Sequence, residues 1–465
     1  MRPTNQAARD KLDTVLRSLA PAGAADLAAR LDVSLPTMLR ILREQGERVV
    51  RIGTTKNARY ALRRPLRGVA KPIPVYRIDA AGRGDDAGTL DLTQPAGAVL
   101  DLAAMGWPTD KEHRAGYWEG LPYPLYDMRP QGFLGRGFAR YHHEDLLVPL
   151  NPRDWADDDI VHALSLYGSD STGNLIVGDR AYRRWLAETA NPEAPIGETG
   201  LPLHYLNLAA QAATLGVAGS SAAGEFPKFT AKREHTGAAT PHVIVKFSGA
   251  ETSSTVRRWA DLLICEHLAL ETLAEHTDLP VAHTRIVEAG GRAFFEAERF
   301  DRHGLLGRSQ VVTLDTLNGA LLGSRETAWP PLAEQVVRMR LAAADLVDQV
   351  RILWWYGKLI GNTDMHLGNV SFRFRPDPRG RVQLNLAPAY DMLPMLYAPL
   401  SGGEIPEAAF NPRLPMPQER GAWSAAFEAA AHFWDRSADD TRVGAGFRTV
   451  CRENYWKLVK LSERA

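Results

Sequence analysis

The stretch Gly361-Asn362-Thr363-Asp364-Met365-His366-Leu367-Gly368-Asn369-Val370-Ser371-Phe372 is the most informative part of this chain. It places an acid, Asp364, and an amide, Asn369, five positions apart on a short polar loop, and a second acid follows at Asp391. Phosphoryl transfer from ATP uses such a set, in which one Asp accepts the hydroxyl proton while the Asn and the later Asp hold Mg²⁺. The pattern therefore predicts Asp364 as catalytic base and Asn369 and Asp391 as metal ligands.

Two features upstream of this loop suit the same chemistry. Small residues between positions 215 and 228 let backbone N–H groups approach phosphate, so Ser221, Gly224 and Lys228 are predicted to contact ATP. The run lacks the Gly-Lys-Ser/Thr ending of a Walker loop, and a plain Gly/Ala/Ser loop is the alternative. Lys246 ends the β-branched strand Pro241-His242-Val243-Ile244-Val245-Lys246-Phe247, and Glu266, in a helix predicted over 256–274, is its expected partner. A surface Lys on an edge strand is the competing interpretation.

Two further segments upstream of Asp364 follow the order that a kinase would need. Residues 294–302, Phe294-Phe295-Glu296-Ala297-Glu298-Arg299-Phe300-Asp301-Arg302, run from an apolar strand directly into charges, which suits a hinge between two lobes or an ordinary strand exit. An almost wholly apolar helix over 347–359 would be buried and would present the Asp364 loop. Asn362-Thr363-Asp364 also fits a simple Asx turn, so the order of the motifs carries the prediction.

Composition is that of an ordinary soluble globular protein, with 45% hydrophobic and 24% charged residues among 465. The net charge is zero, but residues 1–65 hold 13 Lys and Arg against 6 Asp and Glu, so a basic module precedes an acidic body. The cysteines, Cys265 and Cys451, lie in apolar patterns that suggest a reducing compartment. With no apolar signal region and no apolar run of about 20 residues, we expect a cytoplasmic protein without membrane contact.

The basic module has the pattern of a winged helix-turn-helix. Helices are predicted over 8–19, 24–31 and 35–44, with Ser34 as N-cap of the third, and two strands follow at 49–52 and 58–62. The third helix would enter a major groove of double-stranded DNA while the hairpin would lie on phosphates. The predicted DNA-binding residues are Thr37, Arg40, Arg43, Arg51 and Lys56. A small helical docking domain with a solvated basic face is the alternative.

A Pro- and Arg-rich linker follows the module, and the segment up to about residue 200 is rich in Gly and Pro. Strands are predicted at 75–78 and 89–92, and a helix after Trp155. The run His142-His143-Glu144-Asp145 is interpreted as solvated surface, because no second group of ligands supports a metal site.

Over roughly residues 75–445 the chain resembles the HipA family of bacterial toxin serine/threonine kinases. The resemblance rests on Ser221-Ala222-Ala223-Gly224-Glu225-Phe226-Pro227-Lys228, on Glu298-Arg299-Phe300-Asp301-Arg302, and on the loops of Asp364 to Asn369 and Tyr390 to Leu393. It implies autophosphorylation at Ser221 and an adenine pocket lined by Glu298 and Phe300. It also implies that Lys246 binds phosphate and that His366 is among the ATP-binding residues. Many relatives carry Lys where this chain has Gly368, which removes one phosphate contact.

The resemblance also implies the architecture: an α+β, bilobal protein-kinase-like fold of the HipA type, preceded by an all-α winged helix-turn-helix domain as in the YjjJ-like subgroup. The predicted parts are the DNA-binding domain at 1–65, a HipA-type amino-terminal subdomain at 66–205, the kinase N-lobe at 206–302 and the helical C-lobe at 303–465. Implied cofactors are ATP and Mg²⁺. Implied partners are a protein substrate, such as a translation factor of the aminoacyl-tRNA ligase kind, and a helix-turn-helix antitoxin, although the fused DNA-binding module leaves the need for one open.

Three functions follow as hypotheses. The leading one is a toxin-class serine/threonine kinase of a toxin–antitoxin system that arrests growth, joined to a DNA-binding domain. The second, favoured by Gly368 and by the basic module, is a transcription regulator whose kinase-like body only senses nucleotide. The third is a small-molecule phosphotransferase, because those enzymes also use an Asp-x₄-Asn loop.

Overall fold

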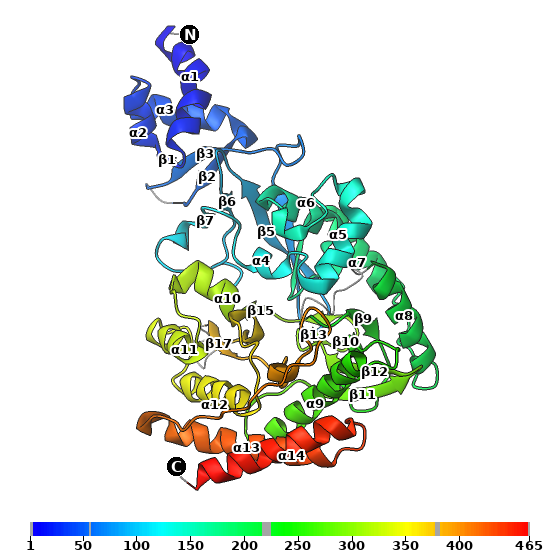
Figure 1. The fold of residues 1–465 in the computed structure, drawn as a ribbon. Coiled ribbons are helices and arrows are strands. Elements are labelled where there is room, and N and C mark those ends of the chain that lie inside the picture. The colour runs from blue at the N-terminus through cyan, green and yellow to red at the C-terminus, as the bar shows by residue number, and fades with distance from the viewer. Residues whose placement is uncertain (1–2, 55–56, 216–224, 377–381, 464–465) are drawn as a thin grey trace. The chain divides into compact units, whose positions relative to one another are not determined.

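The computed structural model describes residues 3–54, 57–215, 225–376 and 382–463 (Figure 1). Its contacts divide the chain into two compact units. The first comprises residues 1–78, 84–129 and 155–191, and the second comprises residues 79–83, 130–154 and 192–465. Among the described residues, no helix is both long and apolar enough to span a bilayer.

The first unit begins with a small helical module. Its helices are α1 (Pro3–Leu19), α2 (Ala24–Arg30) and α3 (Leu35–Glu44). Its antiparallel strands, in the order β1-β3-β2, are β1 (Ala22–Gly23), β3 (Arg59–Leu62) and β2 (Val49–Ile52). The helices enclose an apolar core to which Leu12, Leu27 and Ile41 contribute. Ser34 caps α3 as predicted, since its Oγ accepts from the N–H of Thr37.

A larger antiparallel sheet completes the first unit. Its strands, in the order β7-β6-β5-β4-β8, are β7 (Tyr117–Trp118), β6 (Ala98–Val99), β5 (Gly84–Leu92), β4 (Ile73–Ile78) and β8 (Leu175–Val177). Helices in this unit are α4 (Pro124–Met128), α6 (Asp157–Tyr167) and α7 (Asp179–Ala190). The strands predicted at 75–78 and 89–92 and the helix predicted after Trp155 are thus confirmed. Val50 and Ile52 of the module pack beside Val99 and Tyr117 of this sheet.

The second unit contains a four-stranded antiparallel sheet and the helices that cover it. Its strands, in the order β11-β12-β10-β9, are β11 (Thr284–Ala289), β12 (Arg292–Glu298), β10 (His242–Phe247) and β9 (Lys228–Lys232). The accompanying helices are α5 (Gly132–Leu146), α8 (Leu201–Leu215) and α9 (Ser254–His276). Alternate residues of β10, among them Val243, Val245 and Phe247, join an aromatic core with Tyr205 and Phe294, as the period of two in a strand requires.

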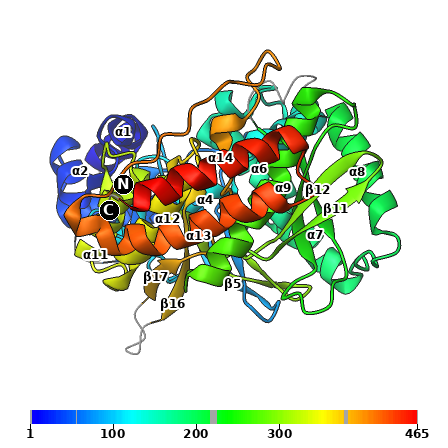
Figure 2. The same cartoon turned by 60° about the horizontal axis from the view of Figure 1, so that its bottom comes forward.

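The rest of the second unit is mainly helical. Its helices are α10 (Leu314–Leu317), α11 (Trp329–Arg338), α12 (Asp345–Leu359), α13 (Arg420–Asp439) and α14 (Ala445–Ser462). Its strands are β15 (Val311–Thr313), β16 (Ser371–Pro376) and β17 (Val382–Leu386), which form one sheet, and the pair β13 (Arg302–His303) and β14 (Gly307–Arg308). Figure 2 shows α13 and α14 side by side, and α13 also packs against α9 and α12.

The predicted α+β fold class is confirmed, with a sheet-containing part and a helical part inside the second unit. The amino-terminal module has the predicted helices, but "all-α" describes it incompletely because β1, β2 and β3 form a sheet beside them. The division of the chain into four parts at residues 65, 205 and 302 stays a prediction.

Candidate active site

The centre of the candidate site is an ammonium group between two carboxylates. Lys246 lies near the end of β10 and Glu266 near the middle of α9, and Lys246 Nζ donates to both carboxylate oxygens of Glu266, at 2.7 and 2.8 Å. The same Nζ also donates to Asp391 Oδ1. Three residues that are far apart in the sequence are thus brought together around one atom.

Burial makes this cluster electrostatically sensitive. Lys246 and Glu266 are 7% and 1% exposed, whereas Asp391 keeps about a third of its side chain in contact with solvent. Burial raises the pKa of Glu266 to about 7, against the opposing pull of Lys246. Burial alone would lower the pKa of Lys246, but Asp391 and Glu266 together hold it above its usual value. For Asp391, burial alone would raise the pKa, but the charges of Lys246 and Lys228 bring that pKa below its ordinary value.

The balance of charge suits a divalent cation. One ammonium faces two carboxylates, so when both are ionised one negative charge remains, and it lies on the partly exposed Asp391 side. Hard oxygen donors of this kind are what Mg²⁺ takes in phosphoryl-transfer sites, together with water and phosphate oxygens. Asp391 has a backbone φ of +55°, in the left-handed region that residues with a side chain rarely adopt.

Aromatic rings enclose the ammonium group. Lys246 Nζ lies 5.3 Å from the ring centre of Phe295 and 5.8 Å from that of Phe226. Phe226 in turn meets Trp259 of α9 edge to face, with 4.8 Å between ring centres. These rings exclude water from one side of the charged group and strengthen its interaction with the carboxylates. Neither Phe226 nor Trp259 was predicted from the sequence to have this role.

The loop that carries Asp364 is tied to the loop that carries Asp391. Asn362 Oδ1 accepts from the N–H of Asp364 at 3.0 Å, and Asn362 Nδ2 donates to the carbonyl oxygen of Asp391 at 3.1 Å. Asn369 Nδ2 donates to the carbonyl oxygen of Asp364 at 2.7 Å, while the Asp364 side chain itself is exposed. The Asx turn considered from the sequence is therefore present, and the same Asn362 also links the two loops.

Further contacts order the loop between Asp364 and Asn369. The exposed His366 accepts the N–H of Gly368 on its Nδ1 at 3.1 Å, and its carbonyl oxygen accepts from Trp329 Nε1 at 3.2 Å. Tyr390, which precedes Asp391, donates its hydroxyl to the carbonyl oxygen of Gly368 at 2.7 Å. A Cβ at position 368 would lie 3.0 Å from the His366 ring, so glycine suits this turn.

The two predicted hinge residues, Glu298 and Phe300, have different surroundings. Phe300 lies 5.6 Å from the Tyr390 ring, measured between ring centres, which places it beside the Asp391 loop. The carboxylate of Glu298 is buried and accepts from Arg233 Nη2 at 3.0 Å. Arg233 also contacts Glu296, which accepts from the hydroxyl of Tyr205. The Glu298 carboxylate is thus part of a buried ion-pair network of the sheet, which the sequence did not reveal.

The small-residue loop is only partly described. Ser221 and Gly224 lie outside the described residues. Immediately after them, the carboxylate of Glu225 accepts from the N–H of Phe133 and from Arg136 Nη2, both at 2.7 Å, at the start of α5. Lys228 Nζ lies 3.5 Å from Glu225, and Lys228 is the cross-strand partner of Lys246. The end of the loop is therefore anchored to α5, and Lys228 brings a second positive charge to the site.

In the first unit, the predicted DNA-binding residues lie on the module. Arg40 and Arg43 of α3 and Arg51 of β2 are exposed, while Thr37 is half-buried and its hydroxyl lies 2.9 Å from that of Ser34. Arg51 donates to the carbonyl oxygen of Thr54 at 2.9 Å. Lys56 lies outside the described residues.

Comparison with known proteins gave matches over most of the chain. Residues 69–186 match the family model of the YjjJ-like toxin middle domain, and residues 220–453 match that of the HipA-like C-terminal domain. Toxin YjjJ of Escherichia coli (strain K12) is 35% identical over 444 residues, which are 96% of each chain.

Two solved structures are more distantly similar. One is HipA of Shewanella oneidensis MR-1 from a complex with HipB and operator DNA, at 14% identity, covering 84% of this chain and 95% of that one with a TM-score of 0.44. The other is the Helicobacter pylori proinflammatory kinase CtkA, at 13% identity, covering 51% and 90% of the two chains with a TM-score of 0.35.

Proposed function

The chain belongs to the family of HipA-like toxins, and we propose that it is an ATP- and Mg²⁺-dependent serine/threonine protein kinase fused to a DNA-binding module. The observation that carries this proposal is the convergence of Lys246, Glu266 and Asp391 on one buried ammonium group. A buried Lys–Glu pair together with an acid that can hold metal is what phosphoryl transfer needs.

Each residue has a definite task in this proposal. ATP with Mg²⁺ would supply the phosphoryl group, and Asn369 and Asp391 would hold the metal. Lys246 would keep its contact with Glu266 and exchange Asp391 for a phosphate oxygen, so that its positive charge faces the transferred group. The exposed Asp364 would accept the proton of a substrate hydroxyl, since its loop is held in place by Asn362 and Asn369.

The charge arrangement supports this exchange of partners. Asp391 is partly exposed and can turn toward a metal ion, whereas Glu266 is fully buried and forms its ion pair with Lys246. Lys228, which already influences Asp391, would add charge near the phosphates, and His366 lies at the start of the turn that holds Asn369. Phe300, next to Tyr390, suits contact with the adenine base.

Autophosphorylation at Ser221 is part of the proposal, with growth arrest as its toxin activity and a translation factor, such as an aminoacyl-tRNA ligase, as its target class. The direct test is incubation with radiolabelled ATP and Mg²⁺, followed by mass spectrometry of the labelled peptide. Label is expected at Ser221, and Asp364→Ala is expected to abolish it while leaving ATP binding intact. The matched control is Asp345→Ala, which removes another acid, at the start of α12, and should leave the labelling unchanged. Persistent labelling in Asp364→Ala would falsify the role given to that residue.

A second candidate function is a DNA-binding regulator whose kinase-like body senses nucleotide. The ion pair between Lys246 and Asp391 favours it, because this contact occupies both a phosphate-binding and a metal-binding group. Gly368 favours it as well, because it stands where many relatives carry a Lys that contacts phosphate. ATP binding without transfer to Ser221 or to any protein of a cell lysate would support this second function against the first.

A further inference from the structure

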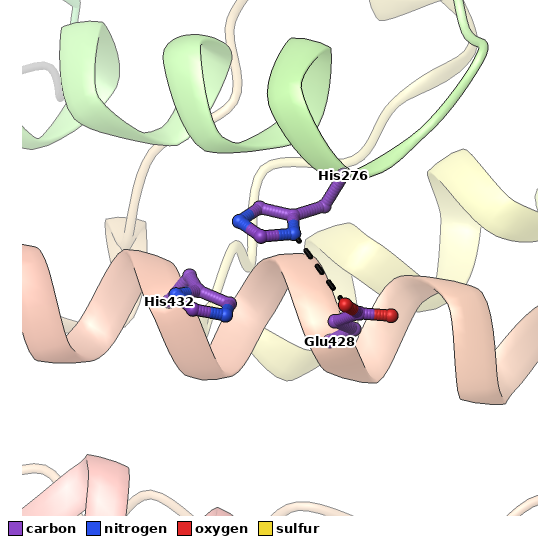
Figure 3. A group of neighbouring side chains, drawn as sticks. All are labelled: His276, Glu428 and His432. Atoms are coloured by element: carbon purple, nitrogen blue, oxygen red, sulfur yellow. Dashed lines mark ion pairs between the residues drawn. The ribbon is translucent and has the colours of Figure 1, made fainter.

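A group of metal-binding side chains lies away from the candidate active site, on the helical part of the second unit. His276 is the last residue of α9, and Glu428 and His432 lie four residues apart on α13. Residues at this spacing share one face of a helix, one turn apart. Figure 3 shows the three side chains next to one another between the end of α9 and the flank of α13.

The contacts within the group are close but weak. The rings of His276 and His432 are stacked, with 4.0 Å between their centres and 13° between their planes. His276 Nδ1 lies 3.6 Å from Glu428 Oε1, which is longer than a good hydrogen bond. One donor atom from each residue can be chosen so that all three lie within 4.8 Å of one another. Within the described part of the chain, no other group of three His, Cys, Asp or Glu side chains meets this limit.

The structure assigns this group as a Zn²⁺ site that links the end of α9 to α13. Two imidazoles and one carboxylate are a donor set that Zn²⁺ takes in proteins, and solvent would supply the fourth ligand. Mg²⁺ prefers six oxygen ligands and would be a poor occupant, so the ion differs from the one proposed at Asp391. Imidazole would also accept Cu²⁺ or Ni²⁺, and Zn²⁺ is the member of this class without a geometric preference of its own.

The geometry allows the small adjustment that the ion requires. Bonds of about 2.0–2.1 Å in a tetrahedron set neighbouring ligand atoms about 3.4 Å apart, so donor atoms that now lie within 4.8 Å of one another must approach by up to about 1.4 Å. Glu428 and His432 are exposed on α13 and can turn without disturbing the core, while the partly buried His276 is the fixed partner. A neighbouring ion pair, Arg436 to Glu275 at 3.0 Å, already holds the end of α9 to α13.

The test is Zn²⁺ binding by isothermal titration calorimetry on the tag-free, full-length protein after treatment with a chelator. One Zn²⁺ per chain is expected at this group, with at least a tenfold loss of affinity in His276→Gln and in His432→Gln and a smaller loss in Glu428→Gln. His283→Gln, which removes another exposed imidazole of the same unit, is expected to bind Zn²⁺ like the wild type. Co²⁺ should give a visible absorption band in the wild type that disappears in His432→Gln.

Thermal unfolding separates metal binding from a folding defect. In chelator the His276→Gln/His432→Gln variant should unfold near the wild-type temperature, because the group is mostly exposed and its ion pair is long. Saturating Zn²⁺ should raise the unfolding temperature of the wild type and leave that of the double variant unchanged. Equal Zn²⁺ affinity and equal thermal shift in the wild type and the double variant would overturn the assignment, as would the absence of any bound Zn²⁺.

Discussion

Replacing Lys246 by Met is the perturbation whose consequences the structure specifies best. The substitution keeps an unbranched side chain, one atom shorter, and removes the charge that Glu266 contacts through both carboxylate oxygens. Glu266 is 1% exposed, so it cannot recover water. Asp391 loses the same partner, but it is partly exposed and can be hydrated. The cost of the substitution therefore depends mainly on the state of Glu266.

The stability lost in Lys246→Met increases with pH. Burial already raises the pKa of Glu266 to about 7, and loss of the Lys246 charge would raise it further. A raised pKa in the folded state means that stability is intact at low pH and is lost as the pH increases through that pKa. At pH 6 the variant carries a protonated Glu266 with unsatisfied hydrogen bonds, at about 1–3 kcal/mol. At pH 9 the cost approaches the roughly 3–5 kcal/mol of a broken buried ion pair.

The assay is thermal unfolding of the nucleotide-free protein followed by circular dichroism at pH 6 and pH 9. At about 2 °C per kcal/mol for a large domain, Lys246→Met should lower the unfolding temperature by roughly 2–6 °C at pH 6 and roughly 6–10 °C at pH 9. Lys246→Met/Glu266→Leu should recover most of the loss and show no extra sensitivity at pH 9, because an apolar pair can replace a buried ion pair. A single variant as stable as the wild type at pH 9, or a double variant less stable than the single one, would refute this reasoning.

Three other predictions concern different parts of the chain. Arg233→Met should lower the free energy of unfolding by about 3–5 kcal/mol in urea titrations, because it leaves Glu298 buried without its counter-charge, whereas Glu296 keeps its ion pair with Arg285; little change would mean that the network is open to water. Asn362→Ala should reduce the rate of phosphoryl transfer by at least tenfold with ATP affinity nearly unchanged, since it unlinks the Asp364 loop from the Asp391 loop; an unchanged rate in a single-turnover assay would speak against that positioning role. Deletion of residues 1–65 should remove salt-dependent binding of duplex DNA in fluorescence anisotropy and preserve ATP binding; DNA binding that survives the deletion would end the winged-helix assignment.

Much of the local structure could be predicted because its causes are local. The apolar spacing and the Ser34 cap predict α3 with its observed bounds, and the β-branched run around Lys246 predicts β10. The nearly apolar stretch before Asp364 predicts α12 to within two residues. The pairing of Lys246 with Glu266 was also expected, since a buried Lys requires a nearby acid.

Other features of the site had no local signal. The second contact of Lys246, to Asp391, spans 145 positions, and the anchor between Arg136 and Glu225 spans 89. Asn362 was interpreted only as a turn residue, because its donor contact depends on where the Asp391 loop lies. Glu298 was expected to line the adenine pocket, but its carboxylate is bound by Arg233. That contact depends on how the chain folds and has no local signal.

The amino-acid sequence alone determined the elements with strong local signals, such as α3, β10 and α12, because helix and strand periods, caps and turns depend on neighbours within a few residues. It also determined which chemical groups were available: the acids, the amide and the lysine of the proposed phosphoryl-transfer site. The tertiary structure alone decided which of these groups meet, how deeply each is buried and hence how each pKa is displaced. The physical reason is that desolvation and Coulomb energy depend on distance in space, which packing of α9, α13 and the central sheet sets and sequence separation does not.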